Sequence, residues 1–124
     1  MAKYLLIQHY EGGAGCDLPM GRWDPADIRA HVDYQHALDA DLVAAGELVE
    51  ARGVARDAKR VVSDGVTAAV SVPSGGLLLA GYRVVDVETE ERAVEIAARS
   101  SAAPGAGGVP IRQPIEVRRI MAAG

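Results

Sequence analysis

Apolar and polar positions along the chain fall into short runs of strand length and two longer segments of helical period. Residues 77–87 ("LLLAGYRVVDV") show the clearest strand pattern, and residues 3–10 ("KYLLIQHY") form a shorter apolar run. The segments 47–54 and 113–121 are predicted to be strands as well. Together these segments supply the strands of the predicted sheet.

Helix boundary signals frame two further segments. Asp24 is a favourable N-cap, Pro25 suits a first helical position, and Gly46 is a C-terminal signal for the same helix. Thr89 is placed to cap a second helix over residues 90–102. The predicted order is therefore strand, helix, strands, strand, helix, strand.

Residues 59–72 are predicted to form two short strands that turn at Asp64-Gly65, a dipeptide typical of β-hairpins. The element order predicts a single α+β domain over residues 1–124, with both helices on one face of a four-stranded sheet. The other face of the sheet is then apolar and open. A small domain does not leave such a face in water, so we expect a homodimer.

Composition narrows the classes of function. The chain is 49% apolar and 24% charged, the balance of an ordinary soluble protein, and its net charge of −4 argues against nucleic-acid binding, which requires clustered Lys and Arg. No run approaches the ~20 apolar residues of a membrane span, and no signal peptide is visible. Cys16 has no second cysteine with which to form an internal disulfide. These features predict a cytoplasmic protein.

The first helix places polar groups where a core helix would carry leucine. On a helical wheel its core face is predicted to comprise Ile28, Val32, Leu38 and Leu42. His31 and Gln35 fall inside the same arc, one turn apart, and Asp39 lies near its edge. Buried polar groups need partners, so this face is either a satisfied polar core or the wall of a functional cavity.

Two interpretations of His31 remain open. Its ring is a core histidine bonded to a carbonyl or to Gln35, or it faces a cavity as an acid, base or hydrogen-bond donor. Asp27, four residues earlier, either orients the ring or favours the helix N-terminus. His9 ends the first strand, either at a solvent-facing strand end or beside His31 at the mouth of one cavity. No metal motif and no phosphate-binding loop is present, so no metal and no cofactor is expected.

Several stretches resemble the YCII-related proteins, and within them the branch known as the DGPF domain. The resemblance rests on "MAKYLLIQHY", "MGRWDPADIRAHVDY", "AGYRVVDVETEERAVEIAARSSAAPGAGGVPI" and "PIEVRRI", and covers nearly the whole chain. It implies a ferredoxin-like fold of the dimeric α+β barrel group, with a cavity between helices and sheet. This agrees with the homodimer expected from the open face.

The chain departs from this family at two places. The family's Asp-Gly-Pro-Phe should lie before "LLAGY", where this chain has "AAVSVPSGG" and only Pro73 matches. The family pairs a histidine of the first helix with an aspartate at the end of the first strand. His31 matches the histidine, whereas His9 or Tyr10 occupies the aspartate position. A His-His pair has different electrostatics, because two adjacent rings do not both carry charge readily.

The resulting hypothesis is a protein that binds a small polar or lactone-type molecule. His31 and His9 are its expected catalytic pair, acting as acid and base. The expected ligand-binding residues are Tyr10, Gln35, Pro73 and Tyr82. The alternatives are a binding or regulatory module without chemistry, and a structural dimer whose polar core groups only satisfy one another.

Overall fold

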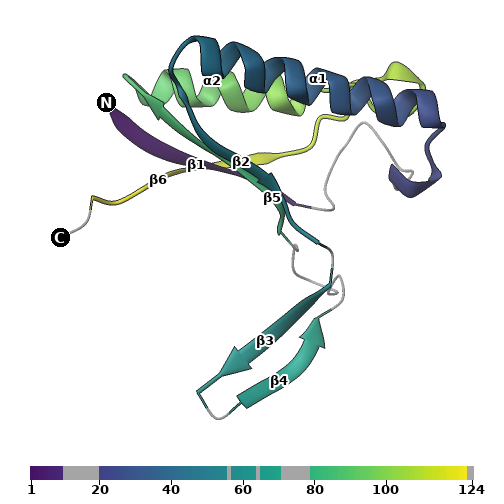
Figure 1. Ribbon diagram of the computed structural model, residues 1–124, viewed down its shortest axis with the longest axis vertical. Helices are drawn as coiled ribbons and strands as arrows, with labels where there is room; N and C mark the ends of the chain where they lie inside the picture. The colour runs from purple at the N-terminus through teal and green to yellow at the C-terminus, as the bar shows by residue number, and fades with distance from the viewer. Residues whose placement is uncertain (10–19, 56, 64, 71–78, 123–124) are drawn as a thin grey trace.

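The computed structural model describes residues 1–9, 20–55, 57–63, 65–70 and 79–122 (Figure 1). Its strands are β1 (Ala2–His9), β2 (Leu48–Gly53), β3 (Ala58–Val62), β4 (Gly65–Val70), β5 (Leu79–Val87) and β6 (Ile115–Arg119). Its α-helices are α1 (Pro25–Ala44) and α2 (Glu90–Ser101), and its short 3-10 turns are η1 (Met20–Arg22) and η2 (Ala106–Gly108). The predicted strands and helices are confirmed, with small differences at their ends.

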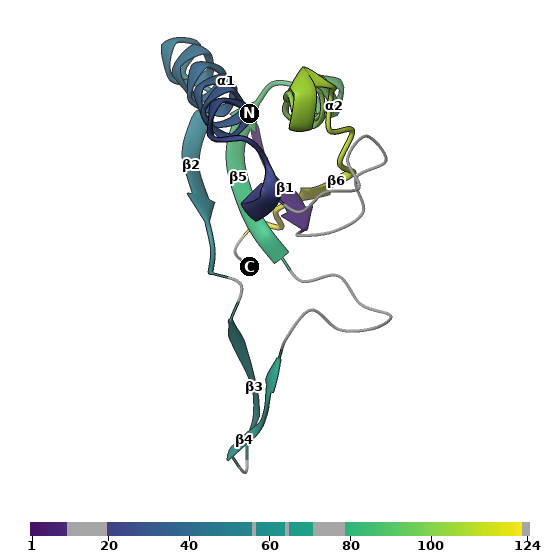
Figure 2. The same cartoon turned by 90° about the vertical axis from the view of Figure 1, so that its right-hand side faces the viewer.

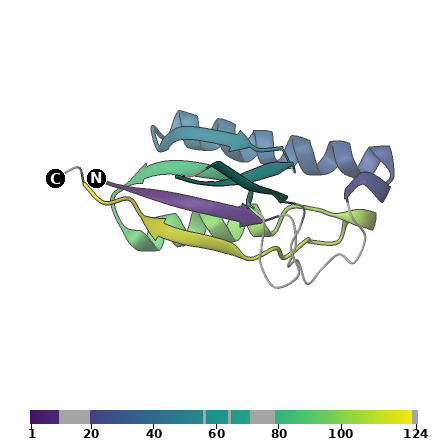
Figure 3. The ribbon, with the colours of Figure 1, turned by 90° about the horizontal axis from the view of Figure 1, so that it is seen from below.

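Four strands form one antiparallel sheet in the order β2-β5-β1-β6. The central strands β1 and β5 pair along their length, from Ala2 opposite Val87 to His9 opposite Leu79. Figure 3 shows β1 lying between β5 and β6, and both helices cover one face of the sheet (Figure 1). With the β3–β4 hairpin set aside, the chain follows a βαββαβ order. The predicted α+β, ferredoxin-like fold is therefore confirmed.

The core lies between the sheet and the helices. Side chains alternate between the faces of a strand, so every second residue of β1 and β5 points toward the helices. The buried apolar cluster comprises Tyr4, Leu6, Leu38, Leu42, Val85, Val87, Ala93, Ile96 and Ala97. Burial of one large aliphatic side chain of this kind stabilises the fold by about 1.5–3 kcal/mol, and this cluster holds both helices on the sheet.

The two helices begin differently. Thr89 caps α2 as predicted, because its side-chain oxygen accepts a hydrogen bond from Arg92 N at 3.1 Å. Asp24 occupies the N-cap position of α1, but its side chain makes no capping hydrogen bond. Its backbone oxygen accepts instead from the nitrogens of Asp27 and Ile28, at 2.9 and 3.1 Å. Pro25 at the first helical turn fits the prediction, because its missing N–H needs no partner there.

The predicted hairpin forms a sheet of its own. β3 and β4 pair with one another, from Ala58 opposite Val70 to Val62 opposite Gly65. Figure 2 shows that this hairpin projects away from the four-stranded sheet, on the side opposite the helices. It is the one part of the described fold that stands apart from the core.

An ion pair joins α2 to the turn between α1 and β2. Arg92 Nε lies 2.9 Å from Glu47 Oε2, and Arg92 Nη2 lies 2.8 Å from Glu47 Oε1. The hydrogen bonds from Arg92 hold the pKa of Glu47 below its ordinary value of 4.5, against the opposing effect of partial burial. The forked geometry makes this contact more specific than a single point-charge pair.

We predict that Glu47→Gln lowers the free energy of unfolding by about 1 kcal/mol at neutral pH, the upper end for partly exposed ion pairs. The folded-state pKa of Glu47 is depressed, so its contribution is present above pH 4.5 and is lost as the pH falls through the folded-state pKa. Urea unfolding of the wild type and of Glu47→Gln from about pH 7 to about pH 3 measures how the difference in their free energies of unfolding changes with pH. Glu95→Gln is the control, because Glu95 lies 3.4 Å from Arg92 and is more exposed. A difference from wild type that stayed constant down to about pH 3 would exclude the ion pair as its source.

Candidate functional site

The inner face of α1 carries a line of polar side chains. His31, Gln35 and Asp39 follow one another at one-turn spacing, the first buried and the other two half-buried. Val32 was predicted to share this face, but that prediction is wrong, since Val32 is 39% exposed. The reason is that α1 buries a narrow stripe through His31 and Leu38, and Val32 lies outside it.

Arg83 of β5 lies between the sheet and both helices and is only 8% exposed. Its Nε donates to Asp39 Oδ1 at 2.7 Å, and its Nη2 donates to Gln35 Oε1 at 2.7 Å. Its Nη1 donates to Ser100 Oγ of α2 at 2.8 Å. A buried guanidinium needs such partners, because an unpaired buried charge is strongly unfavourable. The Arg83 cluster, comprising Arg83, Gln35, Asp39 and Ser100, therefore joins β5 to α1 and α2.

The cluster occupies the space between helices and sheet where a ligand cavity was expected. Gln35 Nε2 donates to the backbone oxygen of Ser100 at 3.3 Å, while Gln35 Oε1 accepts from Arg83. Both ends of the Gln35 amide are thus bonded within the protein. Gln35 Oε1 also accepts from Ser100 Oγ, at 3.3 Å, so a ligand that donates to Oε1 would have to displace one of these bonds, whereas the second hydrogen on Nε2 has no partner among the described residues.

His31 lies one turn before Gln35 and is oriented by a backbone carbonyl. Its Nδ1 lies 3.0 Å from the oxygen of Pro104. A carbonyl oxygen only accepts hydrogen bonds, so Nδ1 carries a proton. The described residues offer Nε2 no hydrogen-bond partner, and in the neutral ring this nitrogen keeps its lone pair. The edge of the ring also meets Trp23, with centroids 5.6 Å apart and planes at 73°.

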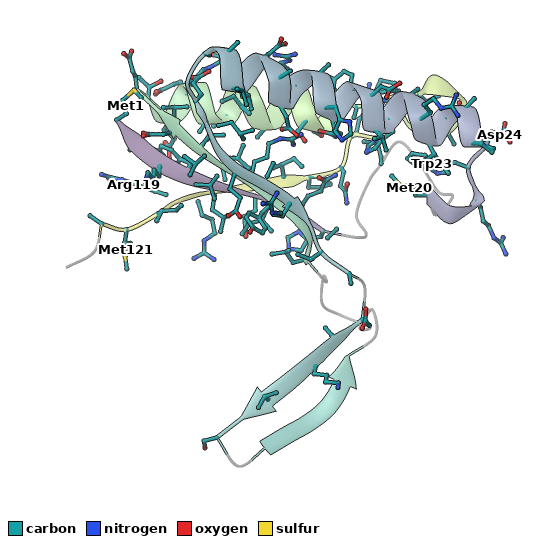
Figure 4. The ribbon with its side chains drawn as sticks, viewed as in Figure 1. Met1, Met20, Trp23, Asp24, Arg119 and Met121 are labelled. Carbon is teal, nitrogen blue, oxygen red and sulfur yellow. The ribbon has the colours of Figure 1, made fainter. Side chains whose placement is uncertain are left out.

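The loop after α2 holds this end of α1 in place. Asp27 Oδ2 accepts a hydrogen bond from Gly107 N at 2.9 Å, so Asp27 binds the loop rather than orienting the imidazole of His31. A Cβ on Gly105 would lie 3.5 Å from the Trp23 ring and 3.3 Å from the oxygen of Val109. The indole would accept a Cβ at ordinary contact distance, and the contact that a Cβ would crowd is the one with the oxygen of Val109. Figure 4 shows Trp23 beside Met20, below the start of α1.

His9 lies on the other side of the sheet. Leu6 faces the helices, whereas Leu5 and Ile7 face away from them. The register with β5 shifts between Gln8 and His9, but the extra residue lies in β5, so the alternation of β1 continues and places His9 with Leu5 and Ile7. The structure therefore does not bring the predicted pair of His9 and His31 together. His9 belongs to the face that the helices leave uncovered, which we call the open face.

Tyr82 also lies on the open face, as the register partner of Ile7. Its hydroxyl donates to Glu50 Oε2 at 3.2 Å. Partial burial and this hydrogen bond to Glu50 raise the pKa of Tyr82 above its usual value of 10. Tyr82 and His31 thus occupy opposite faces of the sheet, so Tyr82 does not line a site around His31.

Two predicted ligand-binding residues, Tyr10 and Pro73, lie outside the described residues. Within the described ranges, no three His, Cys, Asp or Glu side chains gather closely enough to hold a metal ion. Of the helices in the same ranges, none is long and apolar enough to span a membrane.

One surface hollow of 570 Å³ follows the edge strand β2. It is lined by Asp39, Leu48, Val49, Glu50, Ala51 and Arg52. Asp39 connects this hollow to the Arg83 cluster, since its Oδ1 accepts from Arg83. The hollow is broad and open, and it does not include His31.

Sequence reasoning missed four contributors to these sites: Arg83, Ser100, Trp23 and the carbonyl of Pro104. Arg83 stands two positions before Val85 and four before Val87, so strand alternation places it on the same inner face. A single charged residue among inward-facing apolar residues was the signal in the sequence that could have indicated the role of Arg83. Trp23 and the carbonyl of Pro104 carried no comparable signal, because their contacts with His31 depend on how the turn before α1 and the loop after α2 fold against the helix.

The fold and site define a small α+β protein with a four-stranded antiparallel sheet, two covering helices and the buried Arg83 cluster. No model of a known protein family matches the chain, and no curated protein matches it.

We predict that Asp39→Ala lowers the free energy of unfolding by about 2–3 kcal/mol, because it removes the charged partner of a buried guanidinium. Partial exposure of Asp39 places this estimate below the ~3–5 kcal/mol of a fully buried pair. Asp41→Ala is the matched control on the same helix, since Asp41 pairs with Arg99 on the surface and should change stability by less than about 0.5 kcal/mol. Equal effects in chemical denaturation would contradict the role of the Arg83 cluster.

Proposed function

We propose that this chain is a small-molecule-binding protein whose site is centred on the imidazole of His31. The observation that carries the proposal is the ring's orientation: Nδ1 is bonded to the carbonyl of Pro104, and Nε2 has no partner among the described residues. Nε2 is not among the solvent-inaccessible unpaired atoms of the described residues, so it retains access to water or a ligand. The lone pair on Nε2 is therefore available to a ligand.

The chemistry open to this histidine is acid–base catalysis or hydrogen bonding at Nε2. A carbonyl at Nδ1 fixes the tautomer and stabilises an imidazolium less than a carboxylate would. The ring edge of Trp23 supplies an apolar wall beside the imidazole. This combination suits a small molecule with one polar group on an apolar ring, such as a lactone or a phenolic acid.

The YCII-like assignment is part of the same proposal. It is supported by the ferredoxin-like strand order and by a buried histidine on the first helix, at the position where that family carries one. The family's partner aspartate has no counterpart beside His31 in the described residues, since His9 lies on the opposite face. His31 would therefore act without a paired ionisable group from β1.

A non-catalytic binding or regulatory module is the second candidate. The separation of His9 from His31 favours the non-catalytic module. Catalysis that both removes and donates a proton generally uses two ionisable groups, one as base and one as acid. In that case Nε2 accepts or donates one hydrogen bond to a ligand and no product forms. The enzyme and the non-catalytic module would share the binding site at His31, and only the enzyme would convert its ligand to product.

We also propose that the protein is a homodimer that pairs through the open face. The side chains on this face are mostly apolar in the central strands and charged in the edge strands: Leu5, Ile7, Tyr82 and Val84 in the centre, and Glu50, Arg52, Glu116 and Arg118 at the rim. Leu5, Tyr82 and Val84 are half-buried in the single chain, and Ile7 between them is already buried, at 8% exposure. An apolar centre with a polar rim is typical of protein interfaces. The rim carries both signs of charge in equal number, so it complements a second copy of itself.

The binding site is tested by ligand-dependent stabilisation. We predict that a small lactone or phenolic acid from a screened set raises the melting temperature of the wild type, near RT ln(1 + [L]/Kd) in free energy. His31→Ala should lose this response, while His36→Ala should keep it, because His36 is exposed on the same helix. Mass spectrometry of the incubated ligand distinguishes the candidates, since only an enzyme forms product.

The proposal has two contrary outcomes. Stabilisation that survives His31→Ala would place the ligand elsewhere in the protein. If no ligand of either class binds and His31→Leu is as stable as the wild type, His31 is a tolerated core residue, because an apolar group of similar size can replace a satisfied polar one.

A further inference from the structure

The β3–β4 hairpin, which we call the arm, has no described packing against the rest of the chain beyond its connections. β3 and β4 pair only with one another, whereas the remaining strands share one sheet. Figures 1 and 2 show the arm leaving the body on the side of the open face, away from both helices. It therefore extends into the space where a partner at the open face would lie.

An isolated two-stranded hairpin is marginally stable in water, because it buries too little apolar surface. Val61 of β3 is 60% exposed, although valine favours a half-buried strand surface. The arm also leaves both of its outer strand edges without a sheet neighbour among the described strands. Such edges bind another chain readily, so the arm needs a cover that the described residues do not supply.

The length of the arm can be compared with the spacing between two sheets that pack face to face. β3 has 5 residues and β4 has 6, and at ~3.3 Å per residue the arm is roughly 17–20 Å long. Sheets that pack face to face lie only ~10 Å apart. The arm is longer than this spacing and leaves the body on the side of the open face (Figures 1 and 2), so it would lie alongside a second copy packed on that face.

We propose that the arm docks on the second copy of the chain, so that each subunit of the dimer holds the other with its β3–β4 hairpin. This inference rests on the proposed dimer through the open face and adds a reciprocal contact to it. The occupant is a second copy because the arm and the open face lie on the same side of one subunit. A two-fold axis then places each arm against the other subunit.

Sedimentation and hydrogen exchange on the full chain test the inference. The wild type should sediment as a dimer, at twice the 13.0 kDa of the chain, at micromolar concentration. Amides of β3 and β4 should exchange at least tenfold more slowly in the dimer than after dilution to monomer. Val84→Glu on the open face should abolish both the dimer and this protection.

Paired substitutions separate the arm from general surface effects. Val61→Glu should raise the dimer dissociation constant at least tenfold. Val94→Glu should leave it unchanged, because Val94 is similarly exposed, at 51%, but lies on α2 on the helix side of the sheet. Circular dichroism of each variant verifies that the four-stranded fold is retained.

The contrary outcomes are distinct. One outcome is a wild-type dimer in which Val61→Glu dissociates no more readily than Val94→Glu and the amides of the arm exchange as fast as in the monomer. The arm then does not dock on the second copy, while the proposed dimer is retained. If the wild type sediments as a single chain at tens of micromolar, the dimer and the arm contact both fail. The His31 site is judged separately by ligand binding.

Discussion

The buried guanidinium of Arg83 constrains the arrangement of the whole domain. A charge at this depth is tolerated only when its donors are bonded, and its partners come from both helices. Asp39 and Gln35 belong to α1, and Ser100 belongs to α2. The hydrophobic core attaches the helices to the sheet, but apolar contacts alone tolerate sliding and rotation. The directional bonds of Arg83 select one placement of α1 and α2 above β5.

That placement determines where His31 lies. Gln35 is held by Arg83, and His31 stands one turn nearer the N-terminus of the same helix. The loop after α2 then meets this end of α1 through the carbonyl of Pro104 and the backbone of Gly107. The imidazole is held through Nδ1 by the carbonyl of Pro104, and Nε2, on the opposite side of the ring, is not used by this contact. The proposed site is thus a consequence of the polar line along α1: Gln35 and Asp39 bond Arg83, and His31, one turn nearer the N-terminus, keeps Nε2 for the proposed ligand.

The sequence predicts the elements well because their signals are local. The apolar run of 77–87, the cap at Thr89 and the Asp64-Gly65 turn each act over a few residues, and the structure contains a strand at Leu79–Val87, the Thr89 cap and a pair of strands, β3 and β4, on either side of the predicted turn. The polar face of α1 was also predictable, since helical period alone brings His31 and Gln35 onto the buried side. Val32 was misplaced because the wheel does not show how wide the buried stripe will be.

The failures concern contacts between distant segments. Leu5, Leu6 and Ile7 are all apolar, so the pattern of β1 does not reveal which face the helices cover. A shift of one position moves His9 from one side of the sheet to the other. The role of Arg83 depended on knowing that Asp39 and Ser100 would lie opposite it, 44 and 17 residues away along the chain. Side-chain partners of this kind follow from the assembled fold.

Nitrogen–proton NMR of the imidazole rings tests the central claim about His31 most directly. In the neutral ring of His31, Nδ1 should carry the proton and Nε2 should give the signal of an unprotonated nitrogen, as the bond to Pro104 requires. His36, which is exposed, provides the reference for a ring that exchanges between tautomers. A single Nδ1-protonated tautomer for His31 would support the account. A proton on Nε2, or averaging like that of His36, would contradict it.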